Sequence, residues 1–158
     1  MKKIFLMQAL LIISICQVTM AQTISKDNQL SGLLESYYGI KDALVAGNAS
    51  AASAHARSFT KAANAIDYKI ISEGNINALL KDAGAIAAGK NVKKQREIFS
   101  NLSNNMLAVA KAVKLSDQPV YQQYCPMKKA SWLSSEQAIR NPYYGNEMLG
   151  CGEVTNTY

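Results

Sequence analysis

The sequence predicts an all-α protein, an antiparallel four-helix bundle with an irregular C-terminal tail packed on it. Three observations lead to this prediction. Apolar residues recur at helical spacing in four segments between positions 27 and 114, glycine or asparagine lies in the short stretches between segments, and each segment is apolar along one side only. Each apolar side has to be buried, and four helices joined by short loops bury theirs most simply as a bundle.

The first 21 residues are typical of a secretory signal peptide. Lys2 and Lys3 precede an apolar run over residues 4–18, and residues 19–21 offer a cleavage site ending in alanine. We therefore expect export to the periplasm, or beyond it to the cell exterior, and a single mature domain over residues 22–158. No later stretch approaches the roughly 20 apolar residues of a membrane span.

The charge of the mature chain argues against nucleic-acid binding. The leader holds two of the 17 Lys and Arg residues, which leaves 15 against 11 Asp and Glu. The resulting charge of +4 is mild and is not gathered into a basic block, so no nucleic-acid partner is expected.

The first two predicted helices meet at a glycine. Gly47 can end the first helix in a left-handed cap, and Asn48 or Ser50 can cap the start of the second. The apolar stripe of the first helix is Leu30, Leu33, Leu34, Tyr37, Ile40, Leu44 and Val45, and that of the second is Ala52, Ala56, Phe59, Ala63 and Ile66.

The third and fourth predicted helices follow the same logic. Gly89 ends the third, and Asn91 can cap the fourth. The stripe of the third is Ile76, Leu79, Leu80, Ala83 and Ile86, and that of the fourth is Val92, Phe99, Leu102, Met106, Val109 and Val113. The predicted bundle therefore covers residues 27–114.

Residues 115–158 have a different composition. They hold all three prolines and the only tryptophan. They also hold both cysteines of the mature chain, since the third cysteine, Cys16, lies in the leader. Residues 120–125 are compatible with an extended segment. Ser134 to Gln137 match a capping box, which predicts a short helix ending before Pro142. About 44 residues are too few for an independent core, so we expect this tail to pack on the bundle.

Several tail motifs resemble the family called domain of unknown function 3347. They are residues 124–127 (YCPM), 132–134 (WLS), 139–145 (IRNPYYG) and 148–152 (MLGCG), with weaker likeness at 37–38, 41–44 and 96–100. Members of that family are exported bacterial proteins, some of them fused to periplasmic adaptor subunits of copper and silver efflux systems. The resemblance implies a helical periplasmic domain in a heavy-metal context, with an efflux adaptor or metallochaperone as partner and no assigned catalytic residues.

The sulfur-bearing residues of the tail suggest a metal site. Cys125 and Met127 form one short cluster, and Met148 and Cys151 form a second. Thiolate and thioether sulfurs are soft donors suited to Cu(I) or Ag(I). His55, the only histidine, is a further candidate ligand, although a lone histidine beside an apolar stripe is more often structural.

A disulfide is the alternative for the same two cysteines. Exported proteins commonly oxidise a cysteine pair, and a bridge between Cys125 and Cys151 would close 26 residues and stabilise the fold by roughly 3–4 kcal/mol. Trp132, Tyr143 and Tyr144 would then act as aromatic anchors of a stapled tail. Metal site and disulfide both remain open at this point.

The sequence offers little for catalysis. With a single histidine it has no His-rich metal centre, and it contains neither a G-x-S-x-G nor an H-E-x-x-H motif. The two mature cysteines are 26 positions apart and form no C-x-x-C motif. We therefore expect no enzyme. Two functions stay open: a soft-metal binding or efflux-accessory protein, and a disulfide-stapled protein-interaction module.

Overall fold

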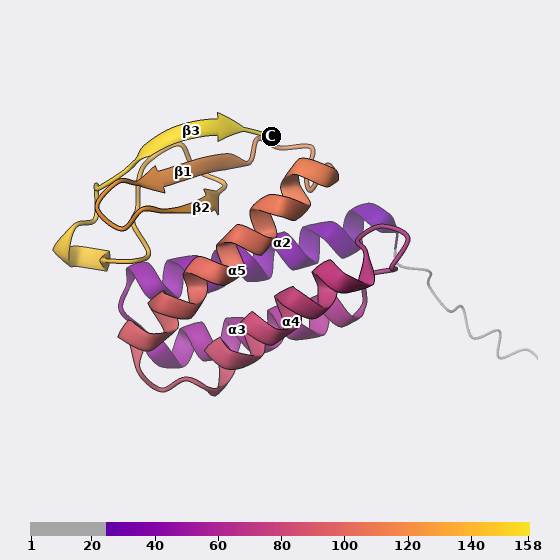
Figure 1. The fold of residues 1–158 in the computed structure, drawn as a ribbon, viewed down its shortest axis with the longest axis horizontal. Coiled ribbons are helices and arrows are strands. Elements are labelled where there is room, and N and C mark those ends of the chain that lie inside the picture. The colour runs from indigo at the N-terminus through magenta and orange to yellow at the C-terminus, as the bar shows by residue number, and fades with distance from the viewer. Residues whose placement is uncertain (1–24) are drawn as a thin grey trace, which may run out of the picture.

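The computed structural model describes residues 25–158, and the predicted leader lies outside this range. The described chain forms four helices followed by a small sheet, which Figure 1 shows stacked on one side of the helices, next to α5. In chain order the elements are α2 (Lys26–Val45), α3 (Ala49–Asn64), α4 (Glu73–Ala88), α5 (Val92–Ala112), β1 (Tyr121–Cys125), β2 (Ala130–Ser134), the 3-10 helix η1 (Gly145–Glu147) and β3 (Glu153–Thr157).

The predicted caps set the helix boundaries. The side chains of Asn48 and Asn91 accept hydrogen bonds from the backbone N–H groups of Ala51 and Lys94, so each satisfies a donor of the first turn of its helix. Gly47, with φ of +71°, makes the sharp turn between α2 and α3, a conformation that costs glycine little. Four helices were predicted from these signals between residues 27 and 114, and residues 25–158 contain four α-helices, all of them in that region.

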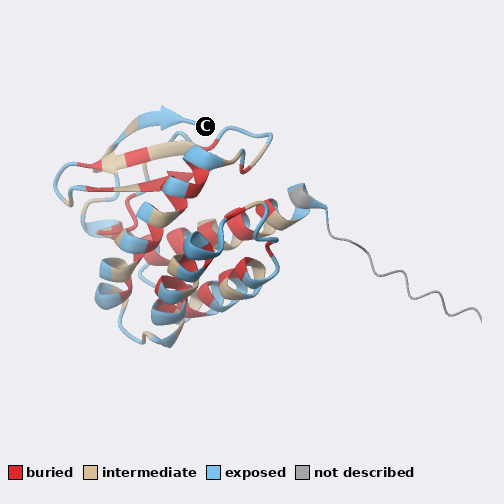
Figure 2. Ribbon diagram, turned by 45° about the vertical axis from the view of Figure 1, so that its right-hand side comes forward, coloured by how far each residue is buried: buried red, intermediate tan, exposed pale blue. Residues whose placement is uncertain are grey.

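The core lies between the helices and continues under the sheet. Each helix packs against the next one in the chain, and β2 packs against α5. Figure 2 shows buried residues along the inner sides of the helices and in β1 and β2, whereas β3 is largely exposed. The predicted stripe residues Phe59, Leu79, Ile86 and Leu102 are completely buried.

The prediction of a purely all-α fold with an irregular tail is wrong, because the tail contains a three-stranded antiparallel sheet. Its strand order is β2-β1-β3. A turn over residues 126–129 joins β1 to β2 and brings Cys125 opposite Ala130; within it Lys129 has φ of +55°. β3 pairs with the other side of β1, with a bulge between Gln122 and Gln123. Residues 120–125, expected to be compatible with an extended segment, contain β1.

The short helix predicted from the capping box is absent. Ser134 ends β2, and its hydroxyl accepts the N–H of Glu136 two residues later, which forms a turn. The side-chain amide of Gln123 on β1 then donates to the carbonyls of Glu136, Gln137 and Ala138. These carbonyls point at the sheet, so they do not accept the bonds that a helix requires.

Aromatic side chains attach the sheet to the helices. The Tyr37 hydroxyl on α2 lies 2.7 Å from Ser103 Oγ on α5 and accepts the backbone N–H of Leu133 on β2 at 3.1 Å. The Tyr37 ring stacks on Phe99 with centroids 5.3 Å apart. Tyr143 continues this row between Phe99 and Trp132. One buried hydroxyl therefore joins two helices and a strand.

Candidate functional site

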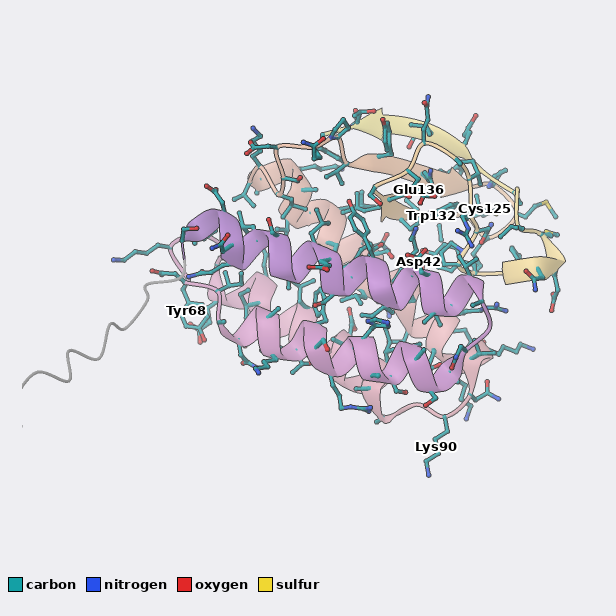
Figure 3. All side chains as sticks on the ribbon, turned by 180° about the vertical axis from the view of Figure 1, so that it is seen from behind. Asp42, Tyr68, Lys90, Cys125, Trp132 and Glu136 are labelled. Atoms are coloured by element: carbon teal, nitrogen blue, oxygen red, sulfur yellow. The ribbon has the colours of Figure 1, made fainter. Side chains whose placement is uncertain are left out.

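The fold brings the two sulfur clusters of the tail together. Cys125 Sγ, at the end of β1, lies 2.8 Å from Cys151 Sγ, just before β3, and the two are free thiols. Cys125 is fully buried and Cys151 is half-buried, so only Cys151 has surface in contact with solvent. Figure 3 shows Cys125 and Trp132 near one another, well away from Tyr68 and Lys90 in the helical layer.

Asn141 positions the chain segment that leads to Cys151. Its backbone N–H donates to the Leu149 carbonyl, and its side-chain amide donates to the Cys151 carbonyl at 2.7 Å. Its side-chain oxygen accepts the N–H of Tyr143. Asn141 is completely buried. The segment from 141 to 151 is therefore closed into a loop by a single side chain.

Gly152 allows the same segment to approach β1. Its φ is +150°, and a Cβ at this position would lie 2.9 Å from the Trp132 ring and 3.0 Å from the Tyr124 carbonyl oxygen. Only a residue without a side chain fits between the indole and the strand. This close approach places the preceding residue, Cys151, beside the end of β1.

The surroundings of the two thiols shift their pKa values in opposite directions. Burial in itself raises the pKa of Cys125, but hydrogen bonds from the Cys151 thiol, the backbone N–H of Lys128, the side chain of Asn141 and the backbone N–H of Met127 outweigh burial and lower the pKa. The hydrogen bond to Cys125 raises the pKa of Cys151, and burial adds to this effect. The negative charge of the singly ionised pair is therefore held mainly on Cys125.

Both predicted methionine ligands lie in the turns that carry the cysteines. Met127 is in the turn after Cys125 and is 65% exposed. Met148 is half-buried, and its carbonyl accepts the backbone N–H of Cys151 at 3.0 Å. Met127 thus follows Cys125 by two residues and Met148 precedes Cys151 by three, in the same turns of the chain.

The structure does not bring His55 to this pair. The side chain is exposed on α3, and its imidazole packs over Gly39 of α2, where a Cβ would collide with it. His55 therefore belongs to the contact between two helices. Within residues 25–158 no group of three His, Cys, Asp or Glu side chains is arranged to hold a metal ion.

The three aromatic residues predicted as anchors lie inside the molecule to different degrees. Trp132 is completely buried, Tyr143 is 5% exposed and Tyr144 is half-buried. The Tyr143 hydroxyl donates to the Ser131 carbonyl at 2.6 Å, which fastens the loop after β2 to the strand itself. Trp132 and Tyr143 thus pack within the protein and offer little surface to a partner.

Sequence reasoning missed the residues that position the thiols. The sequence places Asn141 only at the end of the predicted short helix, and it predicts neither a role for the N–H of Lys128 nor the close packing at Gly152. The one available signal was Asn141-Pro142, because asparagine before proline is typical of a turn in which the asparagine side chain bonds to the backbone.

Comparison with known proteins identifies the family. Residues 33–118, just over half of the chain, match the family described as protein of unknown function (DUF3347). The chain belongs to this family. The match covers most of α2 and all of α3, α4 and α5, whereas most of the motifs on which the resemblance was noted lie beyond it, in the tail. No curated protein and no solved structure matches this member of the family. None of the helices described in it is long and apolar enough to cross a membrane.

Proposed function

We propose that the protein binds one soft monovalent cation, Cu(I) or Ag(I), between Cys125 and Cys151 in the periplasm, as a carrier or accessory of metal efflux. The meeting of the two sulfurs supports this proposal most strongly, because residues 26 positions apart reach 2.8 Å only in the folded protein. Two thiolates are the preferred donor set of these cations.

The surroundings of the pair suit capture and release. A metal requires the thiolate form, and the amides of Met127 and Lys128 favour that form at the buried Cys125. A cation from solvent would reach the pair at Cys151, which is half-buried. The exposed Met127 and the neighbouring Met148 add thioether donors that need no deprotonation, so a cation can pass between them and an adaptor or metallochaperone by ligand exchange.

Anaerobic titration with Cu(I) against a competing chelator tests the proposal. Reduced protein should bind one equivalent, and Cys125→Ser or Cys151→Ser should weaken binding by more than about 100-fold, because each removes a direct ligand. Met148→Leu should weaken it by about 10-fold, within the range for groups that support a metal site.

His55→Ala is the matched control, since it removes the one imidazole of the chain at a position that the fold keeps apart from the thiols. Its affinity should equal that of the unaltered protein. Failure of the reduced protein to bind a stoichiometric cation would reject the proposal.

A second candidate is a disulfide-stapled interaction module. The same contact favours it, because two thiols that meet in an oxidising compartment readily form a bridge. Mass spectrometry of non-reduced protein from a periplasmic extract would then show two thiol hydrogens missing, and the protein would bind no stoichiometric Cu(I) after reduction. Since Trp132 is buried, a partner would contact other residues, and Trp132→Ala would act on the fold first.

A further inference from the structure

We propose that the cysteine pair exchanges with external thiols and disulfides in a fixed direction: the external sulfur joins Cys151, and Cys125 closes or leaves the bond from inside. This reactivity goes beyond cation binding and does not depend on it. It concerns stoichiometric exchange with a low-molecular-weight thiol or disulfide, and no turnover is implied.

Access distinguishes the two cysteines. An incoming sulfur must approach a disulfide along the S–S axis, from the side opposite the leaving sulfur. Cys125 is completely buried at the end of β1, whereas Cys151 is half-buried and precedes the exposed strand β3. Of the two residues only Cys151 has surface that an external reactant can reach.

The position of Cys125 decides which sulfur leaves. Cys125 Sγ lies 2.8 Å from Cys151 Sγ and Cys125 is completely buried, so it is the partner that Cys151 meets inside the fold. An external sulfur that attacks Cys151 of the disulfide therefore displaces Cys125, because the sulfur that is not attacked leaves as the thiolate.

The chemistry balances without an additional oxidant or reductant. An external thiolate attacks Cys151 Sγ, the S–S bond breaks, and its electron pair leaves on Cys125, so that Cys151 carries a mixed disulfide. A second external thiolate then attacks the external sulfur of that mixed disulfide, and Cys151 leaves as a thiolate and takes up a proton. The Cys125 thiolate takes up a second proton from water, so the external pair is oxidised to a disulfide while the protein gains two thiols. In reverse, an external disulfide oxidises the pair.

The test uses the unaltered protein with glutathione disulfide as probe. Reduced protein is mixed with the probe, quenched with acid at short times and mapped by peptide mass spectrometry. The first adduct should lie on Cys151, followed by the internal disulfide. A first adduct on Cys125, or equal amounts of adduct on both cysteines, would overturn the proposal. So would the absence of any glutathione adduct at every time point.

Single-cysteine variants provide an independent test. In Cys125→Ser the remaining Cys151 should accumulate a stable mixed disulfide. In Cys151→Ser the remaining Cys125 should react at least about 10-fold more slowly, because it is buried. Both variants should react at similar rates in denaturant, which shows that the fold causes the difference. Faster reaction of folded Cys151→Ser would contradict the assignment, whatever the outcome of the Cu(I) titration.

Discussion

At the scale of single residues, the tail is organised by buried amides. Gln123 is completely buried on β1, and its amide nitrogen lies 2.8, 3.2 and 3.2 Å from the carbonyl oxygens of Glu136, Gln137 and Ala138. In the segment that follows, the side-chain amide of Asn141 likewise donates a hydrogen bond to the Cys151 carbonyl. Buried carbonyls without donors are costly, so these two side chains hold a stretch that forms neither helix nor strand.

Replacing Gln123 should therefore destabilise the protein. Gln123→Ala leaves buried carbonyls without their donor, for which we expect a loss of about 1–3 kcal/mol in the free energy of unfolding. Gln122→Ala is the matched control on the same strand, because Gln122 is half-buried and its side-chain oxygen accepts the Tyr158 hydroxyl instead of donating to this loop. Urea denaturation measures both, and equal losses would contradict the role assigned to Gln123.

At the scale of elements, the segment between η1 and β3 depends on one glycine. Gly152→Ala should destabilise the protein by about 1–3 kcal/mol and slow closure of the Cys125–Cys151 disulfide, because the new Cβ meets the Trp132 ring and the Tyr124 carbonyl and strains the backbone. Gly150→Ala is the control, since a Cβ there meets no atom within 4 Å. Thermal unfolding and the rate of thiol loss measure the two effects. Equal behaviour of the two variants would contradict this packing.

The helices could be predicted from the sequence because their signals are local. The stripe through Leu33, Tyr37 and Ile40 repeats every three to four residues, and Asn48 and Asn91 cap from their own first turns. The sheet could not be predicted in this way. β1 buries a glutamine, Gln123, among its alternating residues, and its pairing with β3 joins positions far apart in the chain.

The candidate site was predictable in composition and not in geometry. The residue types of Cys125 and Cys151 suggested a pair, but their meeting requires the turn after β1, the loop closed by Asn141 and the contact at Gly152. Similarly, Ser134 followed three residues later by a glutamine predicted the start of a helix. The carbonyls after Ser134 instead bond to Gln123, which is nearby only in the folded chain.

At the scale of the whole molecule, we expect stability to depend on pH through three tyrosines in or beside the core, of which two are buried and Tyr38 is half-buried. Burial raises the pKa of Tyr37, Tyr38 and Tyr143 well above the ordinary value. Below the unfolded pKa of about 10 these hydroxyls are neutral in both states, so their contribution is fully present. Above it the unfolded chain ionises while the folded one stays protonated, which favours unfolding.

We therefore expect the free energy of unfolding to fall steeply above about pH 10, by about 1.4 kcal/mol per pH unit for each tyrosine that stays protonated in the fold. In Tyr37→Phe the decline should be shallower by about 1.4 kcal/mol per pH unit, because one of these tyrosines is removed. The exposed Tyr68, replaced by phenylalanine, should leave the slope unchanged. Chemical denaturation over a series of alkaline pH values gives the slopes, and an unaltered slope in Tyr37→Phe would contradict the assignment.

The two proposals together give the Cys125–Cys151 pair two exclusive states, a free dithiolate that binds a cation and a disulfide that does not. The most direct measurement is anaerobic Cu(I) titration of the same protein before and after oxidation by glutathione disulfide, with native mass spectrometry to count bound metal. We expect one equivalent on the reduced protein and none on the oxidised protein. Equal binding by the two forms, or no stoichiometric binding by the reduced form, would contradict the proposal that these two sulfurs hold the cation.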